Sequence, residues 1–231
     1  MNRSPVAPEF GRERLVFFSD AVFAIAITLL ALDVRVPEIV GTATNEAVAA
    51  AIGDLAPRIF AYALSFAVVG LFWLAHWRRY LLIEHVDEGL VLLNIILLGF
   101  VALIPFPTAL LGEHGDVPIS VVVYALILSA TGFMGTVTWV YADRKGLIDP
   151  DLSRYEVTLG ALRGLAVPIV MLASLALLPI ASTTTVEATW IAIFPVQSLI
   201  RRWARALADR RPAPDEPAPD PPRTPPGSAP G

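Results

Sequence analysis

Long apolar runs constrain the fold of this chain more than any other feature. A helix that crosses a bilayer needs roughly 20 mostly apolar residues. Six segments meet this requirement, residues 15–36, 55–77, 89–111, 118–142, 158–181 and 186–203. None of them alternates apolar and polar residues as the strands of a membrane barrel do. The sequence therefore predicts an all-α polytopic membrane protein with six transmembrane helices per subunit.

The composition agrees with a membrane protein and excludes several other classes. Hydrophobic residues make up 55% of the chain and charged residues only 16%, whereas soluble domains carry about a quarter charged residues. Without cysteine the chain has no disulfide framework, thiolate metal site or cysteine nucleophile. The net charge of -4 is unlike that of a basic nucleic-acid-binding module. No H-E-x-x-H motif and no phosphate-binding glycine loop is present, so we expect no enzyme, no resident cofactor and no nucleic-acid partner.

The chain divides into two regions. Residues 1–207 hold the six apolar segments, and residues 208–231 are rich in proline and poor in bulky apolar side chains. Such a tail buries too little surface to offset its chain entropy, so we expect it to be disordered. A proline-rich ligand for a partner domain remains an alternative. In the third segment, Pro105 and Pro107 predict a kink or an early helix end.

Basic residues predict the orientation of the chain in the membrane. Fourteen of the 17 lie in the N-terminal segment, two of the predicted loops and the C-terminal segment, and cytoplasmic segments are enriched in Lys and Arg. Both termini are therefore predicted to be cytoplasmic, as an even number of spans requires. The excess of arginine over lysine indicates a GC-rich bacterial genome, and we expect the plasma or inner membrane. The residues are Arg3, Arg12, Arg14, Arg78, Arg79, Arg144, Lys145, Arg154, Arg201, Arg202, Arg205, Arg210, Arg211 and Arg223.

A few polar side chains fall inside the predicted spans, where they are costly and therefore functional candidates. Asp20, His76 and Asn94 all lie near the cytoplasmic ends of the first three spans, so they can share one depth. They would form either a hydrogen-bonded clasp between these helices or, through Asp20 and His76, a proton relay. Arg163, in the fifth span, has a stem long enough to reach the cytoplasmic surface.

The first span carries an aliphatic stripe. At about 100° per residue, Ile25, Leu29 and Leu32 lie on one face, with Thr28 ~60° to one side and Asp20 ~140° away. Asp20 therefore cannot line whatever this stripe lines. The spacing alone is also that of a helix that faces lipid or another helix.

The same span begins with an R-x-x-x-F-S-D motif, formed by Arg14, Phe18, Ser19 and Asp20. This motif and the long helix after it resemble the transmembrane protein 175 family, which comprises the lysosomal potassium channel and its prokaryotic homologues. The resemblance continues in Ser65-Phe66, Trp73-x-x-His76, Asn94 and residues 105–108, and it covers roughly residues 12–110.

The resemblance implies a six-span subunit that assembles as a homotetramer, with four first helices around a central pore. It implies that Ile25, Leu29 and Leu32 form the constriction and that Thr28 offers a hydroxyl nearby. The motif residues would pack helices rather than touch ions. The T-V-G-Y-G filter of P-loop potassium channels is absent from the sequence, so we do not expect the tetrameric P-loop channel fold.

We therefore expect a potassium-permeable cation channel that conducts passively in a lipid bilayer, with K⁺ only transiently in the pore. A proton-coupled secondary transporter that uses Asp20 and His76 is the alternative. Acidic residues outnumber Arg35 and Arg58 on the predicted outer side, either as a cation-attracting mouth or because Lys and Arg are scarce there. They are Asp33, Glu38, Glu46, Asp54, Glu113, Asp116 and Glu187.

Overall fold

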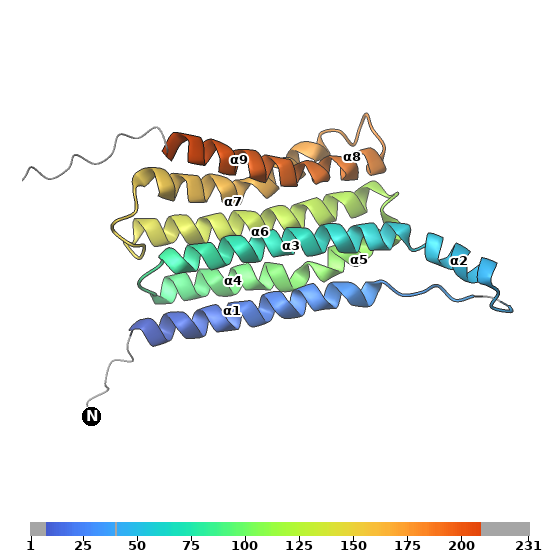
Figure 1. The fold of residues 1–231 in the computed structure, drawn as a ribbon, viewed down its shortest axis with the longest axis horizontal. Coiled ribbons are helices and arrows are strands. Elements are labelled where there is room, and N and C mark those ends of the chain that lie inside the picture. The colour runs from blue at the N-terminus through green and yellow to red at the C-terminus, as the bar shows by residue number, and fades with distance from the viewer. Residues whose placement is uncertain (1–7, 40, 209–231) are drawn as a thin grey trace, which may run out of the picture.

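The computed structural model describes residues 8–39 and 41–208, and these residues form one bundle of long helices that lie side by side (Figure 1). The elements are α1 (Pro8–Leu30), a 3-10 turn η1 (Ala31–Asp33), α2 (Asn45–Gly53), α3 (Ala56–Leu82), α4 (Glu88–Leu103), α5 (Pro105–His114), α6 (Pro118–Arg144), α7 (Arg154–Leu175), α8 (Thr183–Thr189), a 3-10 turn η2 (Trp190–Ala192) and α9 (Ile193–Ala208). The predicted tail lies outside the described residues, apart from Ala208.

Five stretches of helix in the described part of the chain are long and apolar enough to cross a membrane. They are Gly11–Asp33, Ala56–Leu82, Glu88–His114, Pro118–Arg144 and Arg154–Leu175. The region predicted as the sixth span is built differently, from α8, η2 and the 16-residue α9. The predicted end of the fifth span at residue 181 is wrong, because α7 ends at Leu175 and turns follow before Pro179.

The predicted break in the third span is confirmed. α4 ends at Leu103, and α5 begins at Pro105. A proline has no N–H and its ring clashes with the preceding turn, so the regular helix stops before Pro105, and Pro105 and Pro107 lie in the first turn of α5, where a missing N–H is tolerated. The backbone N–H of Ile104 bonds the carbonyl of Val101 instead, as in a 3-10 turn.

The basic segments meet at one end of the bundle. Arg12 Nη1, near the start of α1, donates to the carbonyl of Ile83 after α3, at 3.0 Å. Ile83 forms an isolated antiparallel bridge with Ile148, in the loop between α6 and α7. Figure 1 shows the C-terminal end of α9 at this same end of the bundle. The opposite end carries Asp33 and the ion pair between Arg58 and Glu113.

The core lies around α6, with α1 at the edge of the bundle. Large side chains such as Phe23, Val68, Leu128 and Trp190 are fully buried in one cluster that spans most of the bundle. Figure 1 shows α1 along one edge and α9 along the opposite edge. α1 packs against α3, α4 and α5, so one face of this helix is covered by the chain and the other is not.

Candidate functional site

The aliphatic stripe of α1 lies on its uncovered face. The exposed fractions of Ile25, Leu29 and Leu32 are 59%, 41% and 59%. Thr28 is exposed beside them, and its Oγ1 donates to the carbonyl of Ile25 at 2.9 Å. A hydroxyl that donates to its own helix still presents its lone pairs outward.

The other face of α1 is buried. Leu15, Ser19, Phe23, Ala26 and Leu30 are almost inaccessible, and they repeat at the three- and four-residue spacing of one helix face. The single chain therefore covers one side of α1 and leaves an apolar side open. Inside a membrane, such a side is covered by acyl chains or by other copies of the chain.

A buried polar cluster connects the covered face of α1 to its neighbours. His76 Nε2 of α3 lies 2.9 Å from Asn94 Oδ1 of α4. Asn94 Nδ2 donates to Ser19 Oγ at 2.9 Å, and Ser19 Oγ donates to the carbonyl of Leu15 at 2.8 Å. His76 and Asn94, two of the three side chains that the sequence places at one depth, thus form a continuous chain of hydrogen bonds with Ser19 of α1, whereas the third, Asp20, is not part of it.

Asp20 takes a different partner from the one considered in the sequence. Its Oδ1 accepts a hydrogen bond from Trp73 Nε1 at 2.8 Å. Trp73 lies on α3, about one helical turn before His76. Trp73 stacks on Trp77, with ring centroids 6.4 Å apart. Trp73 belongs to the Trp-x-x-His pattern of the family resemblance, which gave this residue no role. Its signal is that an indole N–H three residues before a buried histidine needs an acceptor nearby.

The remaining motif residues are exposed. Phe18 is exposed in the single chain, and so is Arg14. The motif thus divides into Ser19 and Asp20, which connect α1 to α4 and α3, and Arg14 and Phe18, whose side chains are exposed in the single chain.

A second buried polar cluster was not predicted from the sequence. Ser65 Oγ on α3 lies 2.9 Å from the hydroxyl of Tyr124 on α6. Thr108 Oγ1 on α5 lies 2.8 Å from Ser65 Oγ and 2.9 Å from the carbonyl of Ile104. This cluster connects three helices at the proline break, and the proximity of Thr108 to that break is its only local signal.

Two arginines, one on α3 and one on α7, line the same cavity. Arg79, counted with the loop after the second span, lies within α3, and its guanidinium bonds two backbone carbonyls of α6 and α7. Arg163, expected to reach the surface, is partly exposed, although its Nε is buried, and it lines a cavity together with Arg79. Among the described residues, no group of three or more His, Asp or Glu side chains could hold a metal ion.

Comparisons with known proteins match both the sequence and the fold. The family described as "Endosomal/lysosomal potassium channel TMEM175" matches residues 14–105. A potassium channel of Streptomyces collinus is 37% identical over 142 residues, which are 59% of this chain and 68% of that protein. The endosomal/lysosomal proton channel TMEM175 of Mus musculus is 40% identical over 99 residues, or 41% of this chain and 20% of that protein. The crystal structure of a lysosomal potassium-selective channel TMEM175 homologue from Chamaesiphon minutus superposes with a TM-score of 0.67 at 28% identity, over 84% of this chain and 98% of that one.

Proposed function

Since this chain belongs to the TMEM175 family, we propose that it is a subunit of a potassium-permeable channel whose pore is lined by α1. The family is one of ion channels, so the chain is not an enzyme. The permeant ion is K⁺, and the channel needs no resident cofactor.

The observation that carries this proposal is the division of α1 into two faces. Ile25, Leu29 and Leu32 face away from the chain. Ser19 and Asp20, on other sides of the helix, form hydrogen bonds to α4 and α3. Hydrogen bonds to two neighbouring helices limit rotation of α1 about its axis, so the aliphatic side chains keep a constant direction. A pore constriction needs such a constant direction.

One chain cannot enclose a pore, because α1 lies at the edge of its own bundle. We propose a homotetramer in which four α1 helices meet on a common axis and their aliphatic residues form rings. An aliphatic ring offers an ion no ligands, so the ion keeps part of its water, and a narrow ring closes by dewetting. K⁺ gives up or rearranges its water more cheaply than Na⁺, which supports a modest preference for K⁺.

The proposed topology has six crossings with both termini in the cytoplasm. The sixth crossing is residues 183–208, a continuous helical path through α8, η2 and α9 that at about 1.5 Å per residue is long enough for the hydrocarbon core. The end of the bundle that collects the basic segments faces the cytoplasm. The multi-pass chain then lies in the plasma or inner membrane of a bacterium.

The second candidate is proton movement through Asp20 and His76, and the proton channel among the relatives gives it weight. The hydrogen bonds of the two side chains do not favour it. His76 bonds Asn94 on the covered side of α1, and Asp20 bonds Trp73 at the flank of this helix, so neither bond lies on the exposed stripe.

Ion flux decides between the candidates. Purified full-length protein in liposomes is expected to pass K⁺ down its gradient, with single-channel currents and a reversal potential under K⁺/Na⁺ bi-ionic conditions that favours K⁺ modestly. Saturable flux that requires a pH gradient and shows no unitary currents would instead support the transporter.

A further inference from the structure

Arg79 occupies an unusual place between α6 and α7. Its Nη1 donates to the carbonyl of Gly135 on α6 at 2.6 Å, and its Nη2 donates to the carbonyl of Gly160 on α7 at 3.1 Å. Both acceptors are backbone groups of apolar helices. The guanidinium therefore lies inside the bundle, about one turn from the end of α3.

Glycines make the room for this guanidinium. A Cβ on Gly164 of α7 would collide with Nη2 of Arg79 and with Oγ1 of Thr136. A Cβ on Gly135 would lie 3.0 Å from Nη1 of Arg79, closer than side chains normally approach. Only residues without a side chain at these positions let the charged group enter, so the site is built around it.

The positive charge of Arg79 has no carboxylate partner in the described part of the chain. The two ion pairs found there join Arg58 to Glu113 and Arg154 to Asp143. Carbonyl dipoles satisfy two of the five N–H groups but carry no net negative charge. A cation in a site of low dielectric constant is costly unless an opposite charge lies close to it.

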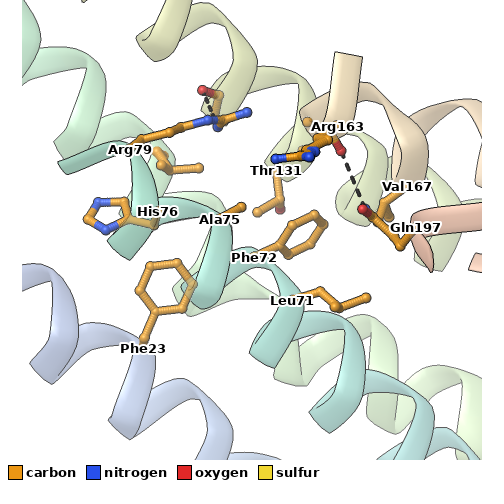
Figure 2. Close-up of a pocket in the computed structure, with 14 residues that line it drawn as sticks. Phe23, Leu71, Phe72, Ala75, His76, Arg79, Thr131, Arg163, Val167 and Gln197 are labelled. Atoms are coloured by element: carbon orange, nitrogen blue, oxygen red, sulfur yellow. Dashed lines mark hydrogen bonds between the residues drawn. The ribbon is translucent and has the colours of Figure 1, made fainter. Parts of the chain in front are cut away.

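A cavity of about 30 Å³ lies beside this group. Figure 2 shows Arg79 from α3 and Arg163 from α7 with their guanidinium groups directed toward each other across it. Thr131 and Gln197 also line the cavity, and none of its described lining residues is acidic. This volume holds one or two water molecules. It therefore admits a halide ion and is too small for a phosphate ester.

We propose that this cavity binds a single chloride ion between Arg79 and Arg163. The anion supplies a negative charge beside Arg79, which has no carboxylate partner among the described residues, and it bridges α3 to α7 in addition to the two carbonyl bonds. It reaches the site from the nearby basic end of the bundle, where cationic side chains attract anions. The site lies apart from the exposed stripe of α1, so it does not depend on the pore proposal.

Thermal unfolding of the full-length protein in detergent tests this site. Chloride and bromide are expected to raise the unfolding midpoint by about 2–4 °C over gluconate at equal ionic strength, with saturation, because only the small anions fit. Arg163→Gln should remove this difference and keep both carbonyl bonds of Arg79. Arg58→Gln, at the opposite end of the bundle, should leave it unchanged. Equal midpoints in the three salts for the unsubstituted protein would overturn the proposal.

Anomalous diffraction from bromide provides a second measurement. It uses the unsubstituted protein and so does not depend on the folding of a variant. Crystals of the unsubstituted protein grown in bromide should show an anomalous peak between the two guanidinium groups. Water alone at that position, or bromide only at the protein surface, would contradict the proposal. Either result leaves the potassium flux of the protein as a separate question.

Discussion

His76 and Asn94 form a buried hydrogen bond between α3 and α4, with Nε2 and Oδ1 2.9 Å apart. Since an amide oxygen only accepts, Nε2 carries the proton and donates it. Asn94 then donates to Ser19, and Ser19 donates to the backbone of α1. The hydrogen bonds thus run in one direction from α3 to α1, and the loss of one member leaves its neighbour unsatisfied.

The first prediction concerns this chain of hydrogen bonds. Ser19→Ala should destabilise the protein by about 1–2 kcal/mol, because Asn94 Nδ2 loses its acceptor in a dry site. Ser129→Ala is the matched control, since the buried Oγ of Ser129 has no partner among the described residues. Its free energy of unfolding should change by less than about 0.5 kcal/mol. Unfolding of both variants by titration with SDS measures the difference, and equal losses would argue against the clasp.

The second prediction concerns Asp20 and Trp73. Asp20→Ala and Trp73→Phe should each weaken assembly more than they change ion preference, because their hydrogen bond joins α1 to α3 away from the aliphatic stripe. A double-mutant cycle should give a coupling energy of about 0.5–3 kcal/mol. Trp77→Phe serves as the control, since Trp77 stacks on Trp73 and has a similar exposed fraction. A changed selectivity in a fully assembled Asp20→Ala channel would contradict the role we propose.

The third prediction places copies of α1 around one axis. The chain has no cysteine, so a single introduced cysteine can form only intermolecular disulfides. Leu32→Cys should form disulfide-linked dimers of the chain under mild oxidation in membranes. Leu126→Cys, on an exposed position of α6, should remain monomeric in the same gel. The same monomeric result for Leu32→Cys would mean that this face of α1 points to lipid.

The fourth prediction concerns selectivity. Leu29→Asn should lower the K⁺/Na⁺ permeability ratio by about two- to tenfold, equivalent to about 0.4–1.4 kcal/mol. An amide offers ligands to Na⁺ and retains water beside it, whereas a ring of leucines disfavours Na⁺. Leu126→Asn is the control, with an exposed fraction of 50% against 41% for Leu29. Bi-ionic reversal potentials measure both variants. An unchanged ratio in Leu29→Asn would remove Leu29 from the constriction.

Some features of the site follow from local sequence and others do not. The angle of Asp20 away from the stripe of Ile25 and Leu29 follows from helix geometry alone, and the structure shows the same separation. The partner of Asp20 does not follow, because the angular position of a residue on its own helix says nothing about how the neighbouring helix is rotated. Trp73 and His76 are both on α3, and only that rotation selects Trp73.

The sequence by itself determined where the chain is apolar enough to enter a bilayer, where Pro105 interrupts a helix and which side chains share the stripe of α1. These properties depend on the composition and spacing of single segments. Only the tertiary structure decided that Arg79 lies between Gly135 and Gly160 and that the stripe remains uncovered. Such contacts join residues more than 50 positions apart, and they depend on how whole helices pack, which no single segment encodes.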